Sequence, residues 1–106
     1  MRIHIIRTNG AEEHIDAPSN EIDELIGAPR GTCTVNLRDG RVMICDDFGY
    51  ETETVDHGQG HMELRPVRAL KPFNAKATSL YRKVCRPGVT HEIVGDVAIV
   101  YDAEYA

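Results

Sequence analysis

Two histidines and two carboxylates stand close together in the segment DHGQGHME, residues 56–63. Asp56, His57, His61 and Glu63 are side chains of the types that bind zinc and other divalent metals. A pair of metal-binding histidines on one helical face needs a helix between them, and the two glycines of this segment disfavour a helix. We therefore expect a solvated segment with surface histidines and no cofactor. His57 and His61 are kept as the alternative ligands of a metal-dependent enzyme.

Nucleophilic catalysis would need a serine, threonine or cysteine beside a base that a third group orients. Ser79, Cys85 and His91 are isolated in the sequence and do not form such a group. The chain has three cysteines, an odd number that is too small for a disulfide scaffold, so reduced thiols in a reducing compartment are expected. The absence of a catalytic motif predicts a protein that is not an enzyme.

The formal net charge of −5 conceals two charged blocks. The segment 65–86 holds seven of the 12 basic residues and no acidic residue, so the rest of the chain holds all 17 acidic residues and only five basic ones. If these blocks segregate on folding, one surface would attract anions and another would imitate an anion. If folding interleaves the blocks, the two fields cancel. The sequence leaves both outcomes open.

Part of the basic block falls on a predicted helix that Asn74 caps and that carries an apolar stripe of Ala77, Leu80, Tyr81 and Val84. Polar residues away from this stripe could hold phosphate groups on a basic face. The residues of this basic face are Lys76, Ser79, Arg82, Lys83 and Arg86. Their ligand would be a small anionic nucleotide, sequestered at an interface of a homo-oligomer, or an acidic patch on a partner protein or sister subunit. The net charge and a pI near 5.4 argue against direct binding of nucleic acid.

The acidic block is densest in the segment 46–61, which is acidic first and then rich in glycine. Its lack of sustained periodicity predicts a long exposed loop, and loops of this length are often functional. The carboxylates of this loop could bind a protein partner by imitating a row of phosphates. These acidic residues are Asp46, Asp47, Glu51, Glu53 and Asp56.

Two runs of β-forming residues flank an Asp-Gly dipeptide at 39–40, a signal typical of a β-hairpin. A two-residue turn would place Leu37 opposite Val42. In that register Cys33 and Cys45 project from opposite faces, so we expect no disulfide or shared metal site between them.

Strands are predicted at 2–7 and 97–101, and a short helix at 21–27. These elements predict an α+β fold: a four- or five-stranded antiparallel or mixed sheet with two helices packed on one face, in the order β-α-β-β-(β)-α-β. The length of 106 residues fits a single domain over 1–106. No apolar run reaches the about 18 residues that span a bilayer, so we expect a cytoplasmic protein with no membrane partner.

The stretches VNLRDGRVMICDDFGYE, KPFNAKATSLYRK and HEIVGDVAIVYD resemble a family of small proteins encoded by bacteriophages, plasmids and other mobile elements, described only as a domain of unknown function. The resemblance covers roughly residues 34–102. It carries no catalytic residues over to this chain. It implies a setting in which such proteins serve as accessory or counter-defence factors. The leading expectation is therefore a non-enzymatic accessory protein that binds a host protein stoichiometrically, such as a defence nuclease or effector.

Overall fold

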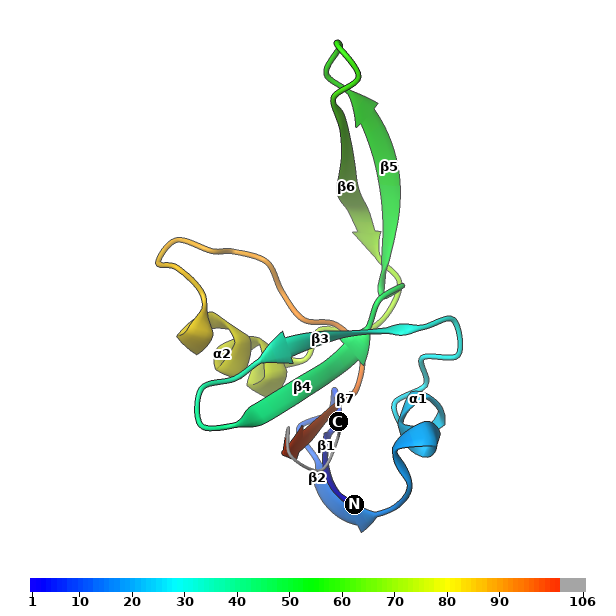
Figure 1. Cartoon of the computed structure of the whole chain (residues 1–106), viewed down its shortest axis with the longest axis vertical. Helices are drawn as coiled ribbons and strands as arrows, with labels where there is room; N and C mark the ends of the chain where they lie inside the picture. Colours follow the sequence, from blue (N-terminus) through cyan, green and yellow to red (C-terminus); the bar gives the residue numbers. More distant parts are fainter. Residues whose placement is uncertain (102–106) are drawn as a thin grey trace.

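The structure, a computed structural model, describes residues 1–101, which form a five-stranded sheet, a separate two-stranded ribbon and two α-helices (Figure 1). The elements in chain order are β1 (Arg2–Ile6), β2 (Glu12–Asp16), the 3-10 turn η1 (Ser19–Glu21), α1 (Ile22–Leu25), β3 (Thr32–Asn36), β4 (Arg41–Asp46), β5 (Tyr50–Asp56), β6 (Met62–Ala69), α2 (Ala75–Val84) and β7 (Val97–Tyr101). The predicted α+β class is confirmed. Within the described residues, no helix is long and apolar enough to cross a membrane.

Neighbouring strands of the large sheet all run antiparallel, in the order β2-β1-β7-β4-β3. Strand β7 lies at the centre, as its unbroken apolar sequence predicts, and its residues 97–100 are all buried. The sequence analysis does not predict the edge strand β2, because Ile15 is its only apolar residue. A strand with so few apolar residues is specified by its pairing with β1 and not by its own pattern.

Both faces of the large sheet are covered by helices. Helix α1 packs through Ile22, and Ile26 directly after it packs likewise, on the face that carries Ile5. Helix α2 packs through Ala77 on the face that carries Ile6. The expectation that both helices share one face is therefore wrong. The physical reason is that β1, β4 and β7 carry apolar side chains on both sides, so each face of the sheet has to be shielded from water.

The segment 46–61 is not a long loop, and that prediction is wrong. Strands β5 and β6 pair with each other and form an arm (residues 50–69) that extends away from the large sheet (Figure 1). The β-branched residues Thr52, Thr54 and Val55 favour the extended conformation of β5. Glu51 and Glu53 alternate with the two threonines in the sequence and hide the strand pattern.

The hairpin of β3 and β4 is confirmed, but its register is shifted by one residue. Leu37 N donates to Arg41 O at 2.9 Å, so residues 38–40 form the loop and Cys33 lies opposite Cys45. The prediction that the two cysteines project from opposite faces is therefore wrong. Strand β4 is buried on both faces, so its own sequence does not decide which face receives the side chains of β3.

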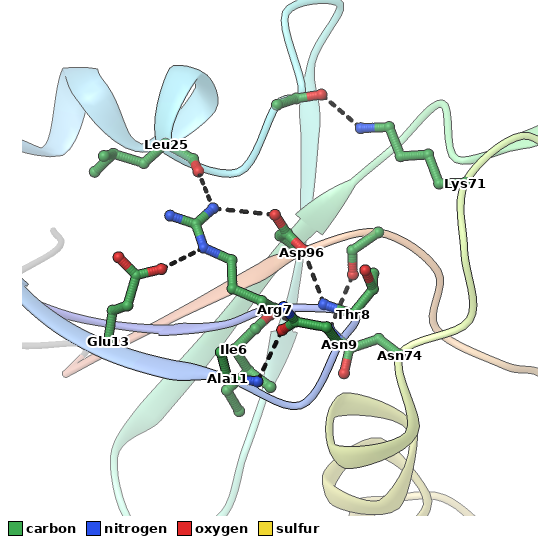
Figure 2. A network of polar contacts seen from close by, with 12 residues as sticks. Ile6, Arg7, Thr8, Asn9, Ala11, Glu13, Leu25, Lys71, Asn74 and Asp96 are labelled. Atoms are coloured by element: carbon green, nitrogen blue, oxygen red, sulfur yellow. Dashed lines mark hydrogen bonds and ion pairs between the residues drawn. The ribbon is translucent and has the colours of Figure 1, made fainter.

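Asn74 joins three parts of the fold at the start of α2. Its side chain is buried, and its Oδ1 accepts a hydrogen bond from Ala77 N at 3.1 Å, which caps the helix as predicted. Its Nδ2 donates to Ile6 O and to Gly95 O, both at 3.0 Å. The buried amide thereby connects the helix to the end of β1 and to the turn before β7 (Figure 2).

The turn before β7 is also held by Asp96. Its Oδ1 accepts from Thr8 N at 2.9 Å, and its Oδ2 accepts from Arg7 Nη1 at 3.0 Å. Arg7 further donates to Leu25 O at 2.7 Å and to Glu13 Oε2 at 2.5 Å (Figure 2). One guanidinium group thus ties α1, β2 and the turn before β7 together.

Replacing Asn74 with alanine should lower the free energy of unfolding by about 2–3 kcal/mol, because α2 loses its cap and two buried carbonyl groups lose their donor. Urea unfolding followed by circular dichroism measures this loss. The matched control is Asn9→Ala, since the exposed Asn9 accepts one bond, from Ala11 N at 2.9 Å, and its loss should cost less than about 1 kcal/mol. Equal losses in the two variants would contradict the role of Asn74.

Candidate functional site

Side chains of varied chemistry meet in an open pocket of about 330 Å³ at the base of the arm. The pocket lies between β3 and β4 on one side and the arm and the segment 91–94 on the other. We call it the arm-base pocket. Its residues with reactive or polar side chains include Cys33, Cys45, Asp47, Tyr50, Tyr81 and His91.

A larger pocket of about 480 Å³ lies at the ends of β1, β2 and β7 and includes His4 and His14. The two rings stack with centroids 4.5 Å apart, and His4 Nε2 lies 2.8 Å from Glu12 Oε1. Both imidazoles are therefore engaged with neighbouring strand residues. The described lining of this pocket contains no thiol or serine hydroxyl, so the arm-base pocket is the better candidate for chemistry.

Cys33 and Cys45 lie directly opposite each other in the ladder of β3 and β4. Cys33 is exposed on the edge strand, whereas Cys45 is buried beside it. The neighbouring Cys45 thiol lowers the pKa of Cys33, although burial and the charge of Asp47 oppose this effect. The neighbouring Cys33 and burial raise the pKa of Cys45. Cys33 is therefore the thiol of the pair that ionises first.

Two tyrosines enclose His91 at the opposite wall of the pocket. The centroid of the His91 ring lies 5.4 Å from that of Tyr50 and 5.9 Å from that of Tyr81. The Tyr50 hydroxyl donates to Glu92 O at 2.7 Å, which attaches the first residue of the arm to the segment before β7. Burial and the charge of Glu92 raise the pKa of Tyr50, so its hydroxyl keeps its proton at neutral pH. The base of the arm is therefore anchored.

Two of the predicted acidic residues shape the chain around them. Asp46 is paired with Lys71 and accepts from Phe48 N at 2.8 Å, and its side chain is only 5% exposed. Asp56 accepts from Gly58 N at 2.8 Å at the start of the turn at the tip of the arm. Asp46 is therefore committed to the fold and presents almost no surface to a partner.

Glu51 and Glu53 lie on the arm, where they face basic residues of β6. Glu51 Oε2 lies 2.9 Å from Arg68 Nη2, and Glu53 is opposite Arg65 in the ladder. The acidic block and the first part of the basic block therefore interleave on one face of the arm. Of the two outcomes that the sequence leaves open, cancellation of the fields applies to this part of the chain.

The two predicted histidines lie at the tip of the arm. His57 Nε2 lies 2.9 Å from Glu63 Oε2, and the rings of His57 and His61 are 5.4 Å apart. Hydrogen bonding to His57 and the neighbouring Arg65 lower the pKa of Glu63. Among residues 1–101, no group of three or more His, Cys, Asp and Glu side chains is placed to hold a metal ion.

The predicted basic residues lie at two different borders of α2. Lys76 Nζ donates to Gly10 O and to Glu12 Oε2, both at 2.7 Å, on the side next to β1 and β2. Arg82 Nη2 donates to Thr90 O at 3.0 Å in the segment that follows the helix. Both cations are thus engaged within the chain, and the nucleotide site stays a prediction. The other members of this set are exposed; they are Ser79, Lys83 and Arg86.

An apolar face of the arm is the feature that the sequence-based prediction misses. Because side chains alternate along paired strands, one face carries Thr52, Thr54 and Asp56 of β5 opposite Pro66, Leu64 and Met62 of β6. Met62 is 56% exposed and Leu64 is 72% exposed. The signal available in the sequence is the alternation of threonine with glutamate in β5 and of apolar with charged residues in β6.

Comparison of the chain with protein-family models, with curated proteins and with solved structures finds no match. The fold and the site together define an α+β protein with a projecting, two-stranded arm. One face of this arm carries most of its charged side chains, and the other, which we call the apolar face, carries the exposed Met62 and Leu64 with two threonines and, at its outer end, Asp56.

Lys71 fastens the segment that follows the arm to the rest of the fold. Its Nζ donates to Gly27 O at 2.5 Å (Figure 2). The same Nζ pairs with the buried carboxylate of Asp46. Lys71→Met should lower the free energy of unfolding, measured in urea, by about 1–3 kcal/mol, because it leaves that carboxylate without its cation. The control Arg68→Met breaks an exposed pair with Glu51 and should cost less than about 1 kcal/mol. An equal cost of the two changes would contradict this assignment.

Proposed function

We propose that this protein is a non-enzymatic binding module that docks on a partner protein through the apolar face of the arm. The observation that carries the proposal is the exposure of β6. All its residues from Met62 to Ala69 are exposed, although Met62 and Leu64 are large and apolar. Apolar side chains gathered on one projecting surface are typical of protein interaction sites.

The isolation of the arm supports this proposal. A two-stranded ribbon by itself is only marginally stable in water, and ribbons usually gain stability from a further layer packed on their apolar face. In Figure 1 the outer part of the arm stands clear of the helices and of the large sheet. A partner surface would supply the layer that the chain itself does not.

A second copy of this chain is a poor occupant of the apolar face. The seven residues of β5 give a face about 23 Å long, and two paired strands give a width of about 10 Å. Two such faces in contact would bury about 500 Å², well below the about 1,200 Å² of a stable interface. We infer a partner with a groove that also receives apolar residues near the base of the arm. These exposed residues are Val67, Leu70 and Phe73.

The chemistry of the arm defines this partner further. The apolar face calls for an apolar groove floor. The carboxylates and guanidinium groups of the opposite face point away from that floor, so they would stay in water or meet polar partner groups of both signs of charge. The resemblance to proteins of bacteriophages and plasmids supports a host protein in the cytoplasm as the partner, such as a defence nuclease or effector. The protein would inhibit it by stoichiometric occupancy.

The test compares two double variants of the full chain with the wild type. Met62→Ser/Leu64→Ser removes the apolar side chains from one face of the arm, and Glu53→Ser/Arg65→Ser removes a charged pair from the other face. Because both pairs are exposed, thermal unfolding should stay within a few degrees of the wild type. Proteins retained from a bacterial host lysate are quantified by mass spectrometry, and each candidate is then purified and titrated against the three proteins.

We expect one purified host protein to bind the wild type in a 1:1 complex. Its affinity should fall at least tenfold for Met62→Ser/Leu64→Ser and less than threefold for the charged-face control. The proposal fails if no purified candidate binds or if the apolar-face variant binds as tightly as the wild type. Native mass spectrometry provides a second refutation. A wild-type dimer that Met62→Ser/Leu64→Ser dissociates would identify a second copy as the occupant, and a bound nucleotide would favour the basic face instead.

A further inference from the structure

We propose that Cys33 and Cys45 form a dithiol site that reacts with hydroperoxides and closes to a reversible disulfide between β3 and β4. The proposal is independent of the function assigned to the arm. It places an oxidative modification site in the arm-base pocket, with hydrogen peroxide as the simplest member of its substrate class.

The register of the two strands brings the thiols together. Leu37 N donates to Arg41 O at 2.9 Å, and Asp47 N donates to Gly31 O at 3.1 Å. Hydrogen-bonded pairs alternate along an antiparallel ladder, so the Cys33–Cys45 pair is of the hydrogen-bonded kind, with Cα atoms about 5.5 Å apart. This separation lies within the range of about 4.4–6.8 Å that a disulfide can bridge. The side chains point to the same face of the sheet because the residues are direct partners.

The two thiols differ in a way that suits a two-step reaction. Cys33 is exposed on the edge strand and lies in the open arm-base pocket, so a small peroxide can reach its Sγ. Cys45 is 4% exposed and is shielded from direct attack by an oxidant. The lowered pKa of Cys33 and the raised pKa of Cys45 agree with this division into an attacking thiol and a resolving thiol.

The reaction balances with peroxide as the oxidant. The Cys33 thiolate attacks one peroxide oxygen, the O–O bond breaks, and the products are a sulfenic acid at Cys33 and hydroxide, which takes up a proton to become water. The Cys45 sulfur then attacks the Cys33 sulfur, the S–O bond breaks, and a second water leaves with the Cys45 proton. Two thiols lose two electrons in total, and one hydrogen peroxide is reduced to two waters.

The geometry also predicts that the bond is easily reduced. Cβ atoms of directly opposed residues are about 4.5–5.5 Å apart, and hydrogen-bonded pairs lie near the upper end of this range. A disulfide prefers a Cβ separation of about 3.8 Å. Closing the bond therefore draws the strands together locally, and a strained, partly exposed disulfide is readily reduced by glutathione. Such a bond is compatible with the reducing compartment that the cysteine content predicts.

Cys85 provides the internal control. It follows the last residue of α2 and is not a ladder partner of either of the other cysteines. Peroxide oxidation of the reduced full-length chain should lower the thiol count under denaturing conditions from three to one. Digestion with trypsin should then release the peptide 31–38 linked to the peptide 42–68, because the Arg65–Pro66 bond resists cleavage. Millimolar reduced glutathione should restore all the thiols.

Variants assign the roles of the three cysteines. Cys85→Ser should form the disulfide at the wild-type rate. Cys33→Ser, a change at an exposed position, should form no disulfide and should leave Cys45 reduced at the same peroxide concentration. Cys45→Ala, which keeps a small apolar side chain in the core, should accumulate a sulfenic acid at Cys33 that dimedone traps.

Three results would overturn the proposal: an unchanged thiol count in the wild type, a linkage that includes Cys85, or a disulfide between two chains. A wild-type reaction rate in Cys33→Ser would also overturn it. These outcomes are distinct from any failure of the arm to bind a partner, because the reaction is measured on the isolated protein.

Discussion

One buried side chain, the amide of Asn74, fixes the parts of this fold relative to one another. Its donor group is shared between the last residue of β1 and the turn before β7, and its acceptor starts α2. An amide that is 1% exposed has to satisfy its hydrogen-bonding groups within the protein, so the start of α2 has one position over the sheet. One turn later Thr78 Oγ1 accepts from Ile93 N at 2.9 Å, which positions the segment that carries His91. The wall of the arm-base pocket therefore depends on the same anchoring of α2.

The position of α2 also explains why the register of β3 is not readable from the sequence. Strand β4 is apolar on both sides, so either register of the β3–β4 hairpin would place Val35 and Leu37 against apolar residues. They pack on the face that α2 covers, and this choice brings Cys33 opposite Cys45. The choice between the two registers is made by a helix that lies more than 30 residues further along the chain. A local pattern carries no information about such a contact.

Sequence patterns identify β1, α2 and β7 because each of these elements carries its own apolar periodicity or a recognisable cap. They do not identify β2, whose apolar content is a single residue, or β5, whose glutamates suggest a solvated loop. The acidic residues of the segment 46–61 attract attention as candidate binding residues, but their basic partners Arg65 and Arg68 come later in the chain. Only the pairing of β5 with β6 brings these charges together. The apolar face of the arm becomes visible at the same step, because that face exists only once two strands are aligned.

The base and the outer part of the arm are organised differently, and this difference bears on recognition. The Tyr50 hydroxyl bound to Glu92 O and the pairing of Lys71 with Asp46 hold the base, whereas the middle of the arm presents Leu64 to solvent. An element whose base is already fixed loses less orientational freedom on binding than a flexible loop does. A smaller part of the free energy of apolar contact is then offset by this entropic cost, and more of it remains as affinity. The charged face adds little long-range attraction because its opposite charges are close together. The thiol pair lies on β3 and β4, in a pocket that Thr52 and Pro66 of the apolar face also line. The proposed oxidation and the proposed partner binding would therefore meet at the base of the arm.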